Sequence, residues 1–280
     1  MENIIAKKSL GQNFLKSKTA LLKMIEAGEI NNEDTVLEVG PGKGVLTEKL
    51  LEKAKKVIAV EKDDRLISFL QEKFATEISA GKLQIIHDDI LNFDLKRNLT
   101  PALSLTNERE KRYKIIANIP YYITGQFLRQ FLETDNQPER IVVMVQKEIA
   151  QRIIANNPTK AGEKKESLLS MSVKAFGTPK MIMKVDKENF SPAPKVDSAI
   201  LLISGISKGF FTDNQITEKD FFATIHAGFA HKRKILASNL KSVFPGVDWA
   251  ERMEKAGLNI KVRAEDLSLV DWMKLISIVI

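Results

Sequence analysis

Five short apolar runs recur between residues 35 and 146, and most of the stretches between them have the length and amphipathic spacing of helices. The runs are TVLEVG at 35–40, KVIAVE at 56–61, KLQIIHDD at 82–89, YKIIAN at 113–118 and RIVVMVQ at 140–146. Nearly continuous apolar runs are typical of strands buried on both faces, and parallel strands need a long connection between them. We therefore predict an α/β domain whose mostly parallel sheet carries helices on both faces.

Two polar stretches and two further strands complete this domain. The stretch 92–112 contains Pro101 and has no clear period, which predicts a long connection with one short helix. Residues 156–166 are expected to form a loop, and 179–186 and 195–204 are expected to be strands. Alternation of apolar residues in the second of these strands favours antiparallel addition to the sheet.

Beyond residue 205 the pattern is helical throughout. Apolar residues recur at helical spacing in 221–244, 249–257 and 266–279, and glycine or proline separates these segments. The sequence therefore predicts two domains, an α/β domain at 1–205 and a small all-helical domain at 206–280.

Composition excludes several classes of site. The 280 residues include no cysteine, which excludes disulfide scaffolds, thiolate metal sites and cysteine nucleophiles. His87, His226 and His231 lack the spacings of a histidine metal site, so we expect no metal. The net charge of +7 favours an anionic partner without identifying it. No stretch has the apolar length of a signal peptide or a membrane span, so we expect a cytoplasmic protein without a membrane partner.

A glycine-rich segment, Glu38–Gly44, begins inside the first run, and its loop starts at Gly40. Such glycines let the backbone turn sharply and approach a ligand at the carboxyl end of a strand. Dinucleotide-binding loops have GxGxxG spacing, whereas this loop has GxGxG spacing and is preceded by Glu38. A carboxylate is unfavourable beside a pyrophosphate but acceptable beside a sulfonium cation, so S-adenosylmethionine is favoured over NAD. A glycine turn without a ligand stays open as the alternative.

Acidic residues end the next two runs. Glu61 follows the loop by about 20 residues, the distance at which a carboxylate accepts hydrogen bonds from ribose hydroxyls. Asp89, after the third run, could accept a hydrogen bond from an adenine amine, although a helix cap or a solvated loop is the commoner role of such residues. These positions favour a nucleoside ligand at the carboxyl edge of the sheet.

The fourth run ends in Asn118-Ile119-Pro120-Tyr121, which carries the most specific chemical signal. An exocyclic adenine amine is a poor nucleophile because its lone pair is delocalised into the ring. The Asn118 oxygen and the Ile119 carbonyl, presented by a turn that Pro120 stiffens, could hold that amine facing an electrophilic methyl group. Tyr121 supplies a ring on which the base stacks. An Asn-x-Pro turn that merely ends a strand is the structural alternative.

Six segments in order resemble the KsgA family of small-subunit ribosomal RNA adenine dimethyltransferases over nearly the whole chain. They are SLGQNFL at 9–15, VLEVGPGKGVLT at 36–47, AVEKD at 59–63, DDIL at 88–91, NIPYYIT at 118–124 and FSPAPKVDSAI at 190–200. The resemblance implies a class I, Rossmann-like methyltransferase domain followed by a small helical domain. It also implies S-adenosylmethionine as the cofactor, and small-subunit rRNA or an immature small subunit as the partner of a monomeric enzyme.

The resemblance also assigns roles to individual residues. Asn13 and Leu15 would close over the methyl donor, Gly40 would line its methionine part, Glu61 would bind its ribose and Asp89 its adenine. Asn118 would contact the donor and hold the target amine, within a catalytic set whose other members are Ile119, Pro120, Tyr121 and Phe190. Of these, Tyr121 and Phe190 would sandwich the flipped base, although Phe190 judged from its residue type alone would be a core aromatic.

Three features depart from the family pattern. Leu10 stands where phenylalanine is common, Tyr122 stands where asparagine is common, and the connection 92–112 is long. None of these differences removes a catalytic group. They bear on the local shape of the site.

The basic residues Lys232, Arg233 and Lys234 fall within the helical pattern of 221–244. If that pattern is one helix with an apolar face, these three residues lie near its solvated side, and we expect them to contact RNA phosphates. A merely solvated face is the alternative. Two other functions also stay open: a large-subunit rRNA methyltransferase of the macrolide-resistance type, and a ribosome-assembly factor that has lost the chemistry.

Overall fold

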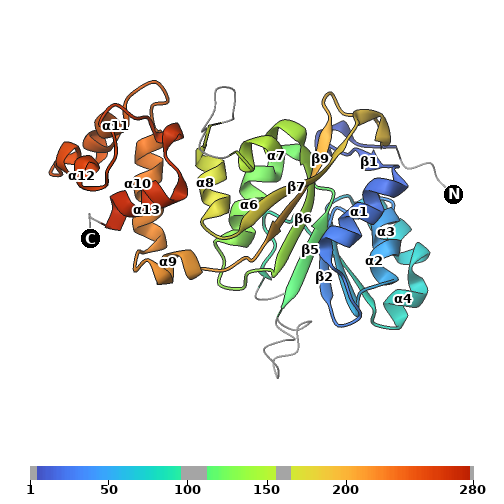
Figure 1. The fold of residues 1–280 in the computed structure, drawn as a ribbon. Helices are drawn as coiled ribbons and strands as arrows, with labels where there is room; N and C mark the ends of the chain where they lie inside the picture. Colours follow the sequence, from blue (N-terminus) through green and yellow to red (C-terminus); the bar gives the residue numbers. More distant parts are fainter. Residues whose placement is uncertain (1–4, 96–111, 156–164, 278–280) are drawn as a thin grey trace. The chain divides into compact units, whose positions relative to one another are not determined.

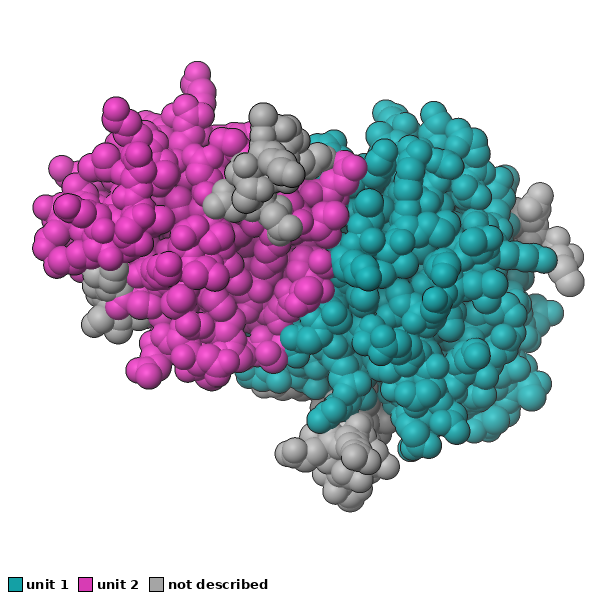
Figure 2. All heavy atoms as spheres, viewed as in Figure 1, with its two compact units in different colours: residues 1–150, 180–206 teal, residues 151–179, 207–280 magenta. Residues whose placement is uncertain are grey.

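The computed structural model describes residues 5–95, 112–155 and 165–277. The short helix expected within 92–112 and most of the loop expected at 156–166 therefore lie outside the described residues. The chain divides into two compact units (Figure 2): residues 1–150 with 180–206, and residues 151–179 with 207–280.

The second unit takes in residues that the sequence pattern places in the first domain. Residues 151–179 cluster with the helices that follow residue 207. Phe176 accounts for much of this, because its ring centroid lies 5.2 Å from that of Phe211 and 5.9 Å from that of Phe222. Its carbonyl also accepts a hydrogen bond of 2.9 Å from the Ser207 amide. These contacts join residues that are distant in sequence, so local periodicity does not reveal them.

The first unit is built on a 7-stranded sheet whose order is β4-β3-β2-β5-β6-β9-β7 (Figure 1). The strands are β2 (Thr35–Val39), β3 (Lys56–Glu61), β4 (Leu83–His87), β5 (Tyr113–Ala117), β6 (Arg140–Gln146), β7 (Thr178–Val185) and β9 (Ser198–Ser204). The pairings among β2 to β6 are parallel, and β9 pairs with β6 antiparallel, as the sequence predicts.

The strand register brings the ends of the predicted runs to one edge of the sheet. Val39 pairs with Val60, and Glu61 pairs with His87. The residues that follow β2, β4 and β5 therefore leave the sheet beside Glu61. This is the carboxyl edge, where ligands bind in open α/β sheets.

Helices cover both faces of this sheet (Figure 1). On one face lie α1 (Lys18–Gly28), α2 (Val45–Leu51) and α3 (Asp64–Lys73), followed by the short α4 (Ala75–Ser79); on the other lie α6 (Thr124–Leu132) and α7 (Lys147–Ile153). On the first of these faces, fully buried side chains such as Met24 of α1 and Leu50 of α2 pack with the strand residue Val57 in one hydrophobic cluster. Within the described residues, no helix is both long and apolar enough to cross a membrane.

A two-stranded sheet attaches the start of the chain to this core. The 3-10 helix η1 (Lys8–Leu10) leads to β1 (Phe14–Leu15), which pairs antiparallel with β8 (Phe190–Ser191). The Lys16 amide adds a hydrogen bond of 2.8 Å to the Asn189 carbonyl. The motif at 9–15 is thereby held beside the motif that begins at residue 190.

The second unit contains α8 (Leu168–Lys174), α9 (Gly209–Asp213), α10 (Glu218–Phe229), α11 (Leu236–Val243), α12 (Trp249–Lys255) and α13 (Leu269–Ser277). The helical pattern at 221–244 is not one helix, because the chain leaves helical geometry after Phe229 and re-enters it at Leu236. The buried Asn239 side chain stabilises this break: its Nδ2 donates to the carbonyls of Gly228 at 2.6 Å and His231 at 3.1 Å. Lys232, Arg233 and Lys234 therefore lie exposed in a loop and not on a helix face.

Candidate active site

A cavity of about 540 Å³ opens at the carboxyl edge of the sheet, within the first unit. Its walls come from the segment 10–16, from the glycine loop and from the residues that follow β3, β4 and β5. The predicted site residues that line it are Asn13, Leu15, Gly40, Glu61, Asp89, Asn118, Ile119, Pro120 and Tyr121. These predicted residues come from five separate sequence motifs, and Ser191 of the sixth motif also lines the cavity.

The glycine loop has a backbone that other residues rarely adopt. Gly40, Gly42 and Gly44 have φ angles of 66°, 59° and 73°, in the left-handed region. At Gly42 a Cβ atom would also lie only 3.0 Å from the Phe14 ring. The loop thus needs glycine both for its turn and for the close approach of the segment that covers it.

The Glu61 carboxylate is buried and held by two backbone amides. Its Oε2 accepts a hydrogen bond of 3.2 Å from Gly42 N, and its Oε1 accepts one of 2.8 Å from Asp63 N. Burial raises the pKa of this carboxyl although both amides oppose the rise. The carboxylate is oriented before any ligand arrives, and each oxygen keeps a lone pair for a hydroxyl donor.

Asp89 is also oriented, and it is already paired. Its Oδ2 accepts from Lys62 Nζ at 2.7 Å, and its Oδ1 accepts from the Leu91 amide at 3.1 Å. Burial alone would raise the pKa of this carboxyl, but the hydrogen bonds from Lys62 and Leu91 outweigh it and hold the pKa below its ordinary value. A hydrogen-bond donor of a ligand that reached this carboxylate would share it with Lys62.

The Asn118 side-chain amide has a nitrogen that is already hydrogen-bonded and an oxygen that can accept. Its Nδ2 donates a hydrogen bond of 3.0 Å to the Asn13 carbonyl, in the segment that covers the cavity. Because an amide nitrogen cannot accept, Oδ1 is the atom of this side chain that is able to accept a hydrogen bond. The structure thus places a possible acceptor directly after β5.

The Tyr121 ring is half-buried and tethered through its hydroxyl. Tyr121 Oη and Ser198 Oγ lie 2.5 Å apart, and Ser198 belongs to the motif at 190–200. Burial raises the pKa of this phenol, so it stays neutral at physiological pH. Its neighbour Tyr122 also lines the cavity, with 65% of its surface exposed.

Comparison with known proteins identifies the family. The family model described as "Ribosomal RNA adenine dimethylase" matches residues 4–280. The chain belongs to this family of dimethylases. A curated relative from Dehalococcoides mccartyi, named "Ribosomal RNA small subunit methyltransferase A", is 41% identical over 279 residues, covering 96% of this chain and 87% of the relative. A relative of the same name from Lactiplantibacillus plantarum is 38% identical over 274 residues, covering 96% and 88%.

Solved structures agree with the fold of this dimethylase. A dimethyladenosine transferase from Plasmodium falciparum superposes with a TM-score of 0.69 at 26% identity, covering 94% of this chain and 95% of that chain. The 23S rRNA methyltransferase ErmE superposes with a TM-score of 0.69 at 22% identity, covering 94% and 98%, and at that identity the likeness concerns the fold alone. The class I, Rossmann-like methyltransferase fold that the sequence predicts is confirmed.

As a dimethylase of this family, the chain uses S-adenosylmethionine as its methyl donor. Glu38 tests whether the cavity suits that molecule. Its side chain lines the cavity with only 1% of the residue exposed, and neither carboxylate oxygen has a hydrogen-bond partner among the described residues. Burial raises its pKa to about 8 and the neighbouring Glu61 adds to the rise, whereas the Thr47 hydroxyl and Lys73 oppose it. A buried acidic side chain in the cavity wall would fit a ligand with an ammonium and a sulfonium group, and Glu61 would fit its ribose.

One predicted member of the dimethylase site lies elsewhere. Phe190 is only 2% exposed and packs in the hydrophobic cluster beneath the sheet's helices, while its neighbour Ser191 lines the cavity. In this structure the ring is a core aromatic, as its residue type alone suggests. Its stacking on a flipped base would require the ring to become accessible.

Sequence reasoning missed two polar residues of the dimethylase that the structure joins beside the cavity. Gln12 Nε2 donates to Asp63 Oδ2 at 2.9 Å, and Asp63 is buried. Gln12 directly precedes the predicted Asn13 in the motif at 9–15, and Asp63 follows Glu61 by two positions. Two polar residues inside otherwise recognised motifs were the available signal, although neither reveals its partner.

Proposed function

We propose that this dimethylase methylates the exocyclic amines of adjacent adenosines in a hairpin loop near the 3′ end of small-subunit rRNA, during ribosome assembly. The relatives named small-subunit methyltransferase A support that substrate, because they match almost the whole chain. We further propose that it acts as a monomer in the cytoplasm, on rRNA or on an immature small subunit.

The observation that carries the chemistry is the hydrogen bond between Asn118 and Asn13. It commits the Asn118 nitrogen as a donor and turns the oxygen toward a substrate. An amine that gives its hydrogens to Asn118 Oδ1 and to the Ile119 carbonyl has its lone pair directed out of the ring plane, where it is a better nucleophile. Ile119 and Pro120 line the same cavity and shape the turn that presents both acceptors.

S-adenosylmethionine, when bound, supplies an electrophilic methyl group. Glu38 balances positive charge on this ligand, Glu61 accepts from its ribose, Asp89 accepts from its adenine, and Gly40 leaves room beside its methionine part. Asn13 and Leu15 cover the cavity and exclude water. No strong base is required among these residues, because a methylated amine that has become cationic is acidic and loses a proton to water.

The target base needs a ring on which to stack outside the RNA helix. Tyr121 serves this role in the proposal, because its hydroxyl is tethered to Ser198 and its ring lines the cavity. Stacking contributes about 1–3 kcal/mol per base. Phe190 serves as the second ring only if β8 opens, since it is buried in this structure.

RNA affinity is assigned mainly to phosphate contacts. Lys232, Arg233 and Lys234 are exposed in the loop between α10 and α11, and Asn239 holds that loop in shape. Three adjacent cations on a fixed loop suit the closely spaced phosphates of a folded RNA. The loop confers affinity without reading sequence.

The test is methylation of small subunits from a strain that lacks this modification. Purified protein and labelled donor are incubated with immature small subunits, with their naked RNA and with large-subunit RNA, and dimethyladenosine is located by mass spectrometry. We expect two adjacent dimethyladenosines in small-subunit RNA. Modification of large-subunit RNA alone would reassign the protein to the resistance type. Donor binding without methylation of any of the three would favour an assembly factor that has lost the chemistry.

A further inference from the structure

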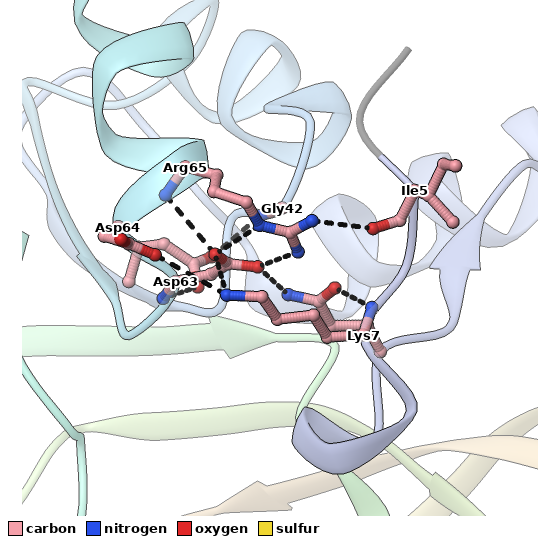
Figure 3. A network of polar contacts seen from close by, with 8 residues as sticks. Ile5, Lys7, Gly42, Asp63, Asp64 and Arg65 are labelled. Atoms are coloured by element: carbon pink, nitrogen blue, oxygen red, sulfur yellow. Dashed lines mark hydrogen bonds and ion pairs between the residues drawn. The ribbon is translucent and has the colours of Figure 1, made fainter.

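Asp63 is a buried carboxylate surrounded by donors from two parts of the chain (Figure 3). Its side chain has 0% of its surface exposed. Arg65, on the first turn of α3, donates through Nε at 3.0 Å and Nη2 at 2.6 Å. A carboxylate this buried needs partners for both oxygens, and here each oxygen has them.

The other donors come from the N-terminal segment, defined as residues 5–16. Lys7 Nζ lies 3.2 Å from Asp63 Oδ1, and Gln12 Nε2 lies 2.9 Å from Asp63 Oδ2. Gln12 Oε1 in turn accepts from the Lys7 amide at 2.8 Å, and Arg65 Nη1 donates to the Ile5 carbonyl at 3.3 Å. The first half of the segment is thus fastened to one carboxylate and its arginine (Figure 3).

Asp63 also contacts the donor-binding carboxylate directly. Its backbone amide donates to Glu61 Oε1 at 2.8 Å, and the other oxygen of Glu61 accepts from the Gly42 amide. One residue therefore touches the ribose-binding group through its backbone and the N-terminal segment through its side chain.

The segment carries this connection on to the acceptor site. Gln12 is followed by Asn13, whose carbonyl orients the Asn118 amide at 3.0 Å. The Phe14 ring then covers the glycine loop, and Lys43 Nζ lies 5.4 Å from the centre of that ring. A continuous path of contacts runs from Glu61 through Asp63, Gln12 and Asn13 to Asn118.

The charge of Asp63 is maintained by this arrangement. The hydrogen bonds from Arg65, opposed by burial and supported by Gln12 and Lys7, hold the pKa of the Asp63 carboxyl well below its ordinary value. The carboxylate stays ionised over the working pH range, so the attachment of the segment does not switch with pH.

We propose that Asp63 is a positioning residue that fastens the N-terminal segment over the cavity and so couples donor binding to the orientation of Asn118. Asp63 touches neither substrate nor donor in this role. The proposal rests on the proposed function only for its methylation measurement, since the attachment and its effect on the donor are measured without RNA.

The decisive variant is Asp63→Asn, with Asp64→Asn as its matched control. Asparagine is as good an N-cap as aspartate, so the cap that Asp63 makes with the Arg65 amide is retained while the charge is lost. Asp64→Asn removes the same charge one residue later. Its side chain is 74% exposed, and its ion pair with Lys7 is long, at 3.6 Å.

Three measurements are made on each protein: amide hydrogen exchange of peptides within 5–16, donor affinity by calorimetry, and turnover at saturating donor and RNA. For Asp63→Asn we expect exchange in 5–16 to rise by about tenfold or more, since weakening a charge-assisted bond by about 1.4 kcal/mol changes an equilibrium tenfold. We expect donor dissociation constants to rise roughly fivefold or more and turnover to fall roughly tenfold. Asp64→Asn should stay within about twofold of wild type in all three.

A second variant keeps the test valid if Asp63→Asn folds poorly. Gln12→Ala leaves α3 and the ion pairs of Asp63 in place and removes the two hydrogen bonds of the Gln12 side chain, with Asp63 and with the Lys7 amide. It loosens the attachment next to Asn13, so turnover should fall more than donor affinity. Unchanged exchange in 5–16 for both variants would overturn the proposal. So would faster exchange there with wild-type donor affinity and turnover. Wild-type protein that binds donor but does not methylate small-subunit RNA would instead count against the proposed function.

Discussion

The Asn118 side-chain nitrogen donates a hydrogen bond of 3.0 Å to the Asn13 carbonyl, across 105 positions of sequence. One residue directly follows a central strand and the other belongs to the segment that covers the cavity. Their contact uses the nitrogen of the Asn118 amide and leaves the oxygen as its acceptor, so in the proposed function the segment that covers the donor also orients the acceptor.

Replacement of Asn118 should affect turnover more than binding. We expect Asn118→Ala to lower single-turnover methylation by about 10²-fold, because an acceptor positioned for the transition state is lost. RNA affinity should change little, since phosphates supply most of it. Asn118→Asp keeps an acceptor but cannot donate to the Asn13 carbonyl, so its methylation rate should lie between those of wild type and Asn118→Ala. Full activity of Asn118→Ala would refute the mechanism.

Replacement of Glu61 should weaken binding of the methyl donor. Hydrogen bonds from hydroxyls to a charged acceptor contribute about 1.5–3 kcal/mol, so Glu61→Ala should raise the donor dissociation constant at least about tenfold in calorimetry. Glu26→Ala, which removes a carboxylate that is 70% exposed on α1, should leave the constant unchanged. Equal affinities for Glu61→Ala and wild type would contradict the assignment of Glu61 to the donor's ribose. Tighter binding of NAD than of S-adenosylmethionine would contradict the assignment of the cavity to this donor.

Donor affinity should rise with pH through the titration of Glu38. Burial raises the pKa of this carboxyl to about 8, so at lower pH it is neutral and offers no charge to a cationic ligand. Affinity should increase by up to about tenfold per pH unit between pH 6 and 8 and level off above. Glu38→Gln should bind weakly and lose most of this slope. A wild-type slope in that variant would exclude Glu38 as the cause.

The same titration should make the donor-free protein less stable as pH rises. The folded state holds the Glu38 proton up to about pH 8, whereas the unfolded chain releases it near 4.5. Between these values the folded state binds more protons, so the free energy of unfolding falls by at most about 1.4 kcal/mol per pH unit from this group. Denaturant titrations of wild type and Glu38→Gln should converge at low pH, where Glu38 is protonated in both states. A constant difference across pH 5–8 would show that Glu38 does not titrate this way.

The basic loop should control the salt dependence of RNA binding. Replacing Lys232, Arg233 and Lys234 together by Ala should weaken RNA binding and reduce the slope of log affinity against log salt by up to about 0.9 for each lost phosphate contact on duplex-like RNA. Donor affinity should not change. A control that replaces the scattered exposed residues Lys18, Lys53 and Lys261 removes the same charge. Equal slopes for the two triple variants would show that Lys232, Arg233 and Lys234 are merely solvated and do not contact RNA phosphates.

The helical tail shows why local pattern reached only part of the structure. Residues 221–244 have the spacing of one helix, yet the chain turns after Phe229. Asn239 compensates the broken helix with bonds to Gly228 and His231, and Gly228 leaves no room for a Cβ beside Trp272 of α13. Asn239 and Gly228 are visible in the sequence as a polar residue and a glycine inside a helical pattern. Only the packing of α10 against α13 shows that they accompany a break in the helix.

Phe190 and Asp63 also show what sequence patterns do not reveal, one as a predicted site residue that is buried and the other as a contact residue that was not predicted. The resemblance assigns Phe190 a place on the substrate, whereas the pairing of β8 with β1 buries its ring. No role was predicted for Asp63 from the sequence, whereas four side-chain groups and the Arg65 amide donate to it. Burial and convergence depend on segments that meet only in the folded chain.

The sequence by itself determined the features that follow from periodic patterns or from neighbouring positions along the chain. Apolar runs at 35–146 predicted the parallel strands, and residues directly after them, among them Glu61 and Asn118, were predicted to meet because parallel strands end at one edge. The tertiary structure alone decided which atoms face one another: that Asn13 orients Asn118, that Asp63 fastens the N-terminal segment, and that Glu38 is left unpaired in the cavity. The physical reason is that secondary structure follows from local sequence, whereas hydrogen-bond partners and burial depend on contacts between distant residues.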